Sequence, residues 1–252
     1  DGWIISAAFS NDGKYIITTS YDNTAKIWET ETGEQIGKTM KHDGWIISAA
    51  FSNDGKYIVT ASNDNTAKIW DAETGEQVGK TMRHDSNVNS AAFSPNGKYI
   101  VTASYDNTAK IWKAETGEQV GKTMKHDYYV NSATFSNDGK YIVTASYDNT
   151  AKIWNAKTGE QIGKTMKHNY WVNSASFSND GKYIITASDD NTAKIWNTKT
   201  GEQMGEMKHD SDVNSAAFSP DGKYIVTASD DGTAKITELI PLQELLDKYN
   251  KL

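Results

Sequence analysis

Cysteine is absent from this 252-residue sequence, and proline occurs only three times. The absence of cysteine excludes a disulfide framework and any zinc site built on thiolate ligands. No apolar run of about 18 residues or more occurs, and no basic and apolar leader opens the chain, so the sequence predicts no membrane-spanning segment. The first residue, Asp1, is not a translation start, so we expect the chain to be an excised or processed piece.

Basic residues are too few to outweigh the acidic ones. The sequence has 26 Lys and Arg against 33 Asp and Glu, which gives a net charge of −7. General nucleic-acid binding needs a basic surface, so this balance argues against a nucleic-acid partner. The sequence also has no His-x-x-x-His pair, no acidic calcium loop and no glycine-rich phosphate loop. We therefore expect neither a bound metal nor a cofactor.

An internal repeat fills the chain. Histidine occurs five times, and each histidine closes a unit of 42 or 41 residues. Cutting after His42, His84, His126, His168 and His209 gives six similar units: 1–42, 43–84, 85–126, 127–168, 169–209 and 210–252. A period of this length marks a repeat architecture. Because the six units account for the whole sequence, no second large domain has room in it.

Each full unit contains four short segments that are apolar or alternate in polarity and are rich in β-branched residues, as strands are. In the second unit these segments are Ile46–Phe51, Tyr57–Ser62, Thr66–Trp70 and Gln77–Met82. The pairs between them tolerate positive φ and favour tight turns: Asp54-Gly55, Asp64-Asn65 and Thr74-Gly75. Four short antiparallel strands repeated in this way predict an all-β propeller, in which neighbouring blades bury each other's faces.

Two recurring motifs resemble those of the WD-repeat β-propeller family. One is the turn after the first strand, most complete as Phe218-Ser219-Pro220-Asp221-Gly222. The other is a Ser-x-Asp turn followed by Thr-Ala-Lys-Ile-Trp, as in Ser62 to Trp70. Six units predict six four-stranded antiparallel blades over residues 1–240, with the sixth unit ending at 240. The family's Trp-Asp pair occurs literally only at Trp70-Asp71, and its Gly-His pair is replaced by Lys-His or Arg-His.

The end of the sixth unit departs from the repeat. Thr237 stands where the other units have tryptophan, so we expect the last blade to be atypical. Beyond it, apolar residues fall at the spacing of one helical face: Leu242, Leu245, Leu246, Tyr249 and Leu252. This spacing predicts an amphipathic helix over 241–252. The helix either caps the exposed last blade or docks on another domain or protomer.

The family resemblance implies a buried hydrogen-bonded set in each complete unit. Its members are a His before the first strand, a Ser or Thr on the second, the turn Asp and the third-strand Trp. The sets would be His42, Ser62, Asp64 and Trp70; His84, Ser104, Asp106 and Trp112; His126, Ser146, Asp148 and Trp154; and His168, Ser188, Asp190 and Trp196. A buried indole N–H or carboxylate needs partners, so we assign these residues a structural role.

The units differ most at two places that share one end of each blade. Aromatic residues follow the opening residue of a unit at Trp3, Trp45, Tyr128, Tyr129, Tyr170 and Trp171, and they occupy the Ser-x-Asp turn at Tyr21, Tyr105 and Tyr147. Polar residues take these places at Asn87, Asp189, Asp212 and Asp230. One face of the disc is thus expected to be aromatic on one side and acidic on the other. Tryptophan and tyrosine are enriched at binding hot spots, so we predict that this face binds a partner. The competing interpretation is that the rings lie flat over neighbouring loops, or that the units drifted after duplication.

These observations favour a non-enzymatic module that binds a protein or peptide. Nearly every His, Asp, Ser and Glu recurs at the same place in each unit, whereas a catalytic site needs residues placed unlike the rest. What the resemblance implies agrees, because WD-repeat propellers mostly serve as scaffolds and recognition platforms. The resemblance also implies a role as the sensor domain of a larger signalling protein, since similar arrays of near-identical units occur in such proteins. The absence of cysteine and of Asn-x-Ser/Thr acceptors favours a cytoplasmic location. The alternatives are a small-ligand or carbohydrate receptor and a purely architectural repeat. The partner's identity and the oligomeric state stay open.

Overall fold

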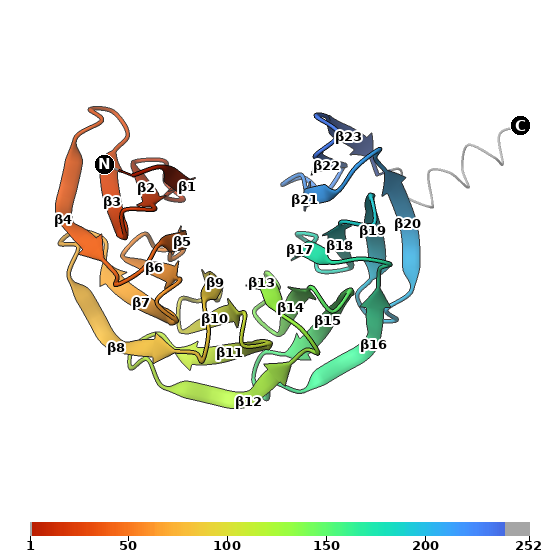
Figure 1. Cartoon of the computed structure of the whole chain (residues 1–252), viewed down its shortest axis with the longest axis horizontal. Coiled ribbons are helices and arrows are strands. Elements are labelled where there is room, and N and C mark those ends of the chain that lie inside the picture. The colour runs from red at the N-terminus through yellow and green to blue at the C-terminus, as the bar shows by residue number, and fades with distance from the viewer. Residues whose placement is uncertain (1, 240–252) are drawn as a thin grey trace, which may run out of the picture.

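The computed structural model describes residues 2–239, and every regular element in that range is a β-strand. The strands form six antiparallel sheets, each built from strands consecutive in the chain. Figure 1 shows these sheets as blades side by side around an arc, with the first strand of each blade at the centre and the last at the rim. The predicted all-β propeller of repeated antiparallel blades is therefore confirmed.

Five blades have four strands, and the sixth has three within the described residues. Blade one comprises β1 (Ile4–Phe9), β2 (Tyr15–Ser20), β3 (Thr24–Glu29) and β4 (Gln35–Lys41). Blade two comprises β5 (Ile46–Phe51), β6 (Tyr57–Ser62), β7 (Thr66–Asp71) and β8 (Gln77–Arg83). Blade three comprises β9 (Val88–Phe93), β10 (Tyr99–Ser104), β11 (Thr108–Lys113) and β12 (Gln119–Lys125).

The remaining strands repeat the same order. Blade four comprises β13 (Val130–Phe135), β14 (Tyr141–Ser146), β15 (Thr150–Asn155) and β16 (Gln161–Lys167). Blade five comprises β17 (Val172–Phe177), β18 (Tyr183–Ser188), β19 (Thr192–Asn197) and β20 (Gln203–Lys208). Blade six comprises β21 (Val213–Phe218), β22 (Tyr224–Ser229) and β23 (Ala234–Glu238). The helix expected over 241–252 lies outside the described residues.

The hairpins turn at the residues that tolerate a left-handed backbone. In blade two, φ is 71° at Gly55, 69° at Asn65 and 70° at Gly75, the second residue of each predicted turn pair. Gly75 also needs its small size, because a Cβ there would lie 2.2 Å from the carbonyl oxygen of Lys38 in blade one. The turn chemistry therefore fixes both the strand ends and the close approach of one blade to the next.

The hydrophobic core lies between the blades. One face of each blade packs against the blade before it, and we call this the leading face; the trailing face packs against the blade after it. In the cluster between blades two and three, the trailing face supplies Val59, Ala61, Ala67, Ile69 and Met82, and the leading face supplies Val88, Ala91, Ile100 and Trp112. Each neighbouring pair forms such a cluster. A blade thus depends on its neighbours for burial of both faces.

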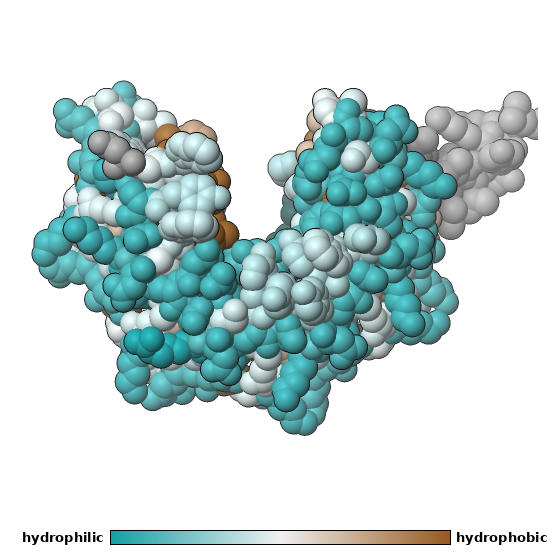
Figure 2. All heavy atoms as spheres, viewed as in Figure 1, coloured by the Kyte–Doolittle hydropathy of each residue, from teal (hydrophilic) through white to brown (hydrophobic). Residues whose placement is uncertain are grey.

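The arc does not close. Figure 1 shows blades one and six as its two ends, and Figure 2 shows that side chains leave the opening between them unfilled. Hydrophobic atoms line the edge of blade one along this opening (Figure 2). The predicted count of six blades is confirmed. Among residues 2–239, no helix is long and apolar enough to cross a membrane.

The tryptophans of the third strands allow a direct test of inter-blade burial. Trp112 is buried against blade two, whereas the equivalent Trp28 faces the opening and is only half-buried. We expect Trp112→Ala to lower the free energy of unfolding by about 3–5 kcal/mol, as deletion of a buried aromatic does. Trp28→Ala should cost at least about 1 kcal/mol less, because less packing is lost. Urea unfolding of both variants measures the difference, and equal losses would contradict inter-blade packing as its source.

Candidate functional site

The most regular polar feature of the molecule is a chain of hydrogen bonds inside each complete blade. In blade two the Trp70 indole Nε1–H donates to Thr60 Oγ1 at 2.8 Å. The same hydroxyl lies 2.8 Å from His42 Nε2, and His42 Nδ1 lies 2.8 Å from Asp64 Oδ2. Burial lowers the pKa of His42, so the ring is neutral. Thr60 O–H then donates to Nε2, and Nδ1–H donates to the carboxylate.

Asp64 lies at the end of this series of hydrogen bonds, and both of its carboxylate oxygens accept two hydrogen bonds. Its Oδ1 accepts from the Thr66 hydroxyl at 2.5 Å and from the Thr66 backbone N–H at 2.9 Å. Its Oδ2 accepts from His42 and from the Asp43 backbone N–H. Burial by itself raises the pKa of the Asp64 carboxyl, but the hydrogen bonds from His42 and Thr66 outweigh it and hold that pKa well below its usual range. The carboxylate is therefore charged and satisfied in the fold.

The structure corrects one member of the predicted set. The hydroxyl between His42 and Trp70 belongs to Thr60, and Ser62 lies one step further along the same strand face. Ser62 Oγ donates to the Gly44 carbonyl and accepts from the Asp64 backbone N–H instead. Ser104, Ser146 and Ser188 are placed in the same way. The recurrence of threonine at 18, 60, 102, 144, 186 and 227 was the signal for the bridging residue.

The other predicted members come together as expected from the repeat. Blades three, four and five contain the sets His84–Thr102–Trp112–Asp106, His126–Thr144–Trp154–Asp148 and His168–Thr186–Trp196–Asp190. The end blades are incomplete. Within residues 2–239, blade one pairs Trp28 with Thr18 and contributes no histidine to the set, and blade six joins His209 to Thr227 and Asp231 without a tryptophan.

This arrangement has the connectivity of a catalytic triad, with a hydroxyl on one imidazole nitrogen and a carboxylate on the other. The Thr60 side chain is buried, and its oxygen already accepts from Trp70. No substrate atom can approach a hydroxyl in that position, so these sets stabilise the blades and do not supply a nucleophile.

The variable loops of the sequence meet at one end of each blade. The loop before the first strand and the Ser-x-Asp turn are joined by a backbone hydrogen bond in every blade, for example from the Tyr147 N–H to the Tyr129 carbonyl at 2.9 Å. Equivalent bonds join residues 21 and 3, 63 and 45, 105 and 87, 189 and 171, and 230 and 212. The two variable places thus share one end of the blades.

The rings of these loops form two clusters that cross blade boundaries. The first cluster is Trp3, Tyr21 and Trp45, in which the Tyr21 ring lies edge-on to Trp45 at 4.6 Å between centroids. The second cluster, which we call the aromatic ladder, contains Tyr105, Tyr128, Tyr129, Tyr147, Tyr170 and Trp171. In the ladder Tyr129 stacks on Tyr105 at 4.6 Å, and Trp171 stacks on Tyr147 at the same separation.

Stacking leaves the ladder only partly covered. Tyr128, Tyr170 and Trp171 stay exposed, whereas Tyr105, Tyr129 and Tyr147 are half-buried by their neighbours. Burial, together with Tyr105 and the charge of Asp189, raises the pKa of Tyr147 to about 12. The ladder therefore presents a neutral aromatic surface across blades three to five.

Acidic residues adjoin the ladder on blades five and six. Burial, with a contribution from the charges of Asp212 and Asp230, raises the pKa of Asp189 above its ordinary value. Asn173 donates to Asp189 at 2.5 Å, and Asn214 donates to Asp230 at the same distance. The Asp189 backbone N–H donates to the carbonyl of Trp171 in the ladder at 3.0 Å, so the aromatic and acidic regions adjoin.

A row of asparagines that was not among the predicted site residues lies beside the acidic region of this face. Asn89 donates to Asn131 Oδ1 at 2.6 Å, and Asn131 donates to the Asn173 carbonyl at 2.7 Å. The row runs along the first strands of blades three to five, where Asn173 donates both to Asp189 and to the Val213 carbonyl of blade six. Units one and two carry Ile5 and Ile47 at this place, and that switch from isoleucine to asparagine was the available signal.

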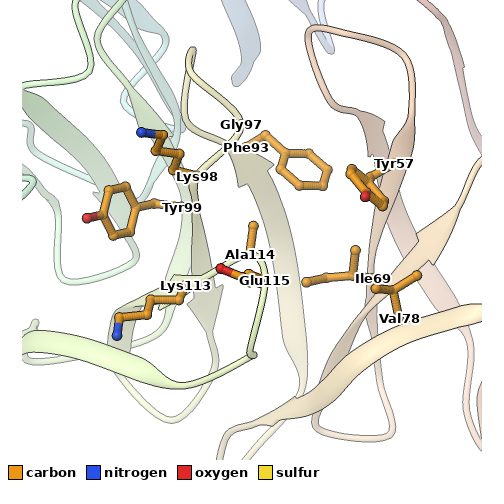
Figure 3. Close-up of a pocket in the computed structure, with 10 residues that line it drawn as sticks. All are labelled: Tyr57, Ile69, Val78, Phe93, Gly97, Lys98, Tyr99, Lys113, Ala114 and Glu115. Atoms are coloured by element: carbon orange, nitrogen blue, oxygen red, sulfur yellow. The ribbon is translucent and has the colours of Figure 1, made fainter.

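A cavity of about 470 Å³ lies between blades two and three, at the other end of the blades. Figure 3 shows the Tyr57 and Phe93 rings facing each other across it, with Ile69 and Val78 along one side. The side chains of Lys98, Tyr99 and Lys113 point away from its centre (Figure 3). Ligand sites normally combine apolar walls with converging polar groups, so this cavity is a weaker candidate than the aromatic face.

The bridging threonine allows a test with an internal control. Thr102→Val leaves both His84 Nε2 and Trp112 Nε1 without a partner in the core, so we expect a loss of about 1–3 kcal/mol in the free energy of unfolding. Thr18→Val in blade one leaves only the half-buried Trp28 unpaired and should cost less. Urea denaturation measures both. A larger loss at Thr18 would show that the bridge is not what stabilises the blade.

The buried histidines predict how stability changes with pH. Burial lowers the pKa of His42, His84, His126 and His168 in the fold, while the unfolded chain keeps histidine near about 6.5. The unfolded state therefore binds more protons below that pH, and stability should fall as the pH is lowered from about 7.5 to about 5. Below about pH 4, protonation of the paired aspartates should add to the loss.

Urea unfolding at several pH values measures this slope. The variant His126→Gln removes one of the titrating groups and should show a shallower decline between about pH 7.5 and 5 than the parent chain. A parent chain whose free energy of unfolding stays constant or rises over this interval would contradict neutral buried imidazoles.

A family model described as the first β-propeller of IFT122 matches residues 3–248. None of the curated protein sequences matches the chain. The matched range covers nearly the whole sequence and includes all six blades. The chain therefore belongs to the family of the first β-propeller of IFT122, and its repeated blades make it a propeller of the WD-repeat type.

Proposed function

We propose that this propeller is a non-enzymatic recognition module that binds a protein or peptide through the aromatic ladder of blades three to five and the aspartates beside it. The observation that carries the proposal is the stacking of rings from successive blades into one partly exposed surface. Membership in a propeller family supports an interaction scaffold in general terms.

The ladder has the physical properties of a binding hot spot. The Tyr128–Tyr129 and Tyr147–Trp171 pairs are stacked at 4.2 and 4.6 Å between centroids, so their rings are held in place before a partner arrives. Rigid aromatic groups bury large areas on binding and lose little conformational entropy. The exposed rings of Tyr170 and Trp171 provide the area that a partner would cover.

The adjoining charges define the kind of partner. Burial and the negative charges of Asp212 and Asp230 raise the pKa of the Asp189 carboxyl, so these aspartates lie near one another. A partner with a lysine or arginine next to an apolar or aromatic side chain would match both regions. Its cation could also lie over the exposed rings, a contact worth about 0.5–2 kcal/mol. We therefore propose a basic or mixed peptide segment as the ligand.

Two other functions have specific observations behind them. Stacked tyrosine and tryptophan rings also suit the faces of sugars, and the cavity between blades two and three gives a small ligand a second place to bind. The regular buried sets would serve a purely architectural repeat equally well. The peptide-binding proposal differs from both because it requires the aspartates as well as the rings. We further propose that the module works in the cytoplasm as the sensor or docking part of a larger signalling protein.

Affinity capture with matched baits tests this proposal. The first bait is the parent chain, and the second carries Tyr128→Ala, Tyr170→Ala and Trp171→Ala, all exposed residues of the ladder. We expect the second bait to retain less than about a tenth of the partner, because hot-spot rings each contribute about 2 kcal/mol or more. The third bait carries Tyr57→Ala and Tyr99→Ala, which remove similarly exposed rings beside the cavity, and should bind like the parent.

The aspartates are tested separately. A bait with Asp189→Asn, Asp212→Asn and Asp230→Asn keeps the shape of the face, and the captured partner should bind it more slowly and with weaker dependence on salt. All baits must give the circular dichroism spectrum of the parent. Loss of binding only in the third bait would move the site to the cavity. Binding of glycans in place of a polypeptide would favour the receptor function.

A further inference from the structure

The first cluster, formed by Trp3, Tyr21 and Trp45 in the loops of blades one and two, is not part of the proposed peptide site. Trp3 is 82% exposed, Trp45 is 48% exposed and Tyr21 is 41% exposed. Tryptophans that belong to the core are covered far more completely, and Trp70 of the same pair of blades is only 5% exposed. Packing of the blades therefore does not account for these three rings.

The angles between its rings distinguish the first cluster from the aromatic ladder. Trp3 lies at 75° to Tyr21 with 6.3 Å between centroids, and Trp45 lies at 89° to Tyr21 with 4.6 Å between centroids. The stacked pairs of the ladder are within 11° to 15° of parallel, so the rings of each pair cover one another's faces. An edge-to-face contact covers a face of only one of its two rings. The first cluster thus leaves aromatic faces free that point in different directions.

Glycine precedes both tryptophans of the first cluster and holds their loops close to the neighbouring turns. A Cβ at Gly2 would lie 2.7 Å from the backbone nitrogen of Asp22, and one at Gly44 would lie 2.9 Å from that of Asp64. The other four units carry a side chain at this place. The two loops therefore pack against the Ser-x-Asp turns more closely than a side chain would allow, which fixes the backbone of each tryptophan before a ligand arrives.

The charges next to these rings are negative. Asp22 follows Tyr21 in the chain, and Asp43 lies two residues before Trp45. A hydrogen bond from the Thr24 hydroxyl lowers the pKa of the Asp22 carboxyl, so this group is charged. The described residues of the four loops concerned, 2–3, 21–23, 43–45 and 63–65, include no lysine or arginine. Aromatic faces and carboxylates both attract a cation, so the ligand of this cluster should carry positive charge.

We propose that the first cluster binds the trimethylammonium group of a trimethylated lysine in a polypeptide. The three methyl groups of this cation can contact ring faces that point in different directions, while its charge is attracted to the same faces. The group has no N–H and needs no hydrogen-bond acceptor. An unmethylated lysine is compact and strongly hydrated, so it loses more on leaving water for an aromatic surface.

The charges favour a polypeptide over a lipid as the source of this group. The phosphocholine headgroup of a lipid also ends in a trimethylammonium, but it carries a phosphate next to it. That phosphate would meet the carboxylates of Asp22 and Asp43 without a basic residue in the described loops to pair with it. The side chain of trimethyllysine has no anionic group, so it fits the cluster without this repulsion.

Isothermal titration of the parent chain with three short peptides tests the proposal. The first peptide has one trimethyllysine between glycine and serine residues, and the second has an unmodified lysine in its place. The third has a neutral side chain of the same shape, in which carbon replaces the ammonium nitrogen. We expect the trimethyllysine peptide to bind at least about 10-fold more tightly than the neutral one, because only the cation is attracted to the ring faces. It should also bind more tightly than the lysine peptide.

Variants taken from the repeat itself locate the site. Tyr21→Asn and Trp45→Asn introduce the residue that other units carry at the same places, Asn63 and Asn87, so the fold should tolerate them. Each should weaken binding of the trimethyllysine peptide by at least about 5-fold, and both together by at least about 10-fold. The control, Tyr147→Asn, makes the same change in the aromatic ladder and should alter the affinity by less than about 2-fold. All variants must give the circular dichroism spectrum of the parent.

Four results would overturn the proposal. No measurable binding of the trimethyllysine peptide, or equal binding of the neutral peptide, would show that the cluster does not recognise this cation. Weaker binding only in Tyr147→Asn would place the cation on the ladder. Tighter binding of free phosphocholine than of the trimethyllysine peptide would make a lipid headgroup the ligand. The peptides contain no aromatic or apolar side chain for the ladder, so this proposal and the proposed function can fail independently.

Discussion

Burial of each blade by its two neighbours is the interaction on which the rest of the structure depends. A single four-stranded sheet of this sequence has apolar residues on both faces, and only a stack of blades removes them from water. The buried hydrogen-bonded sets, the close approach of Gly75 to Lys38 and the stacking of loop aromatics all require that neighbouring blades be held together. The blades at the ends of the arc, which lack one neighbour, are also those with incomplete sets.

The strands and turns were predictable because they depend on local sequence. In blade two the predicted segments agree with the observed strands to within one residue, since Gly55, Asn65 and Gly75 take the left-handed conformations that end each strand. The positions of the variable loops were also predictable, because consecutive strands reverse direction. The near-identical units strengthen both predictions, since every unit shows the same pattern of strand segments and turn residues.

Contacts between units were not predictable from spacing alone. Thr60 and Ser62 lie on the same side of one strand, and only the three-dimensional placement of His42 decides which hydroxyl reaches its ring. The stacking of Tyr147 on Trp171 and the bond from Asn89 to Asn131 join residues from different blades, and their geometry depends on how the blades are rotated against each other. The open ends are likewise a property of the assembled arc.

Because the interior interfaces are nearly identical, they do not by themselves determine the order in which the blades pack around the arc. Trailing faces such as Val59 with Ile69 and Val101 with Ile111 present almost the same surface to the next blade. Nothing in these surfaces distinguishes the correct neighbour from a blade two places away or from a blade of another molecule. Blade order is therefore set by short connections such as His84–Asn87, and folding at high concentration favours exchange of blades between chains.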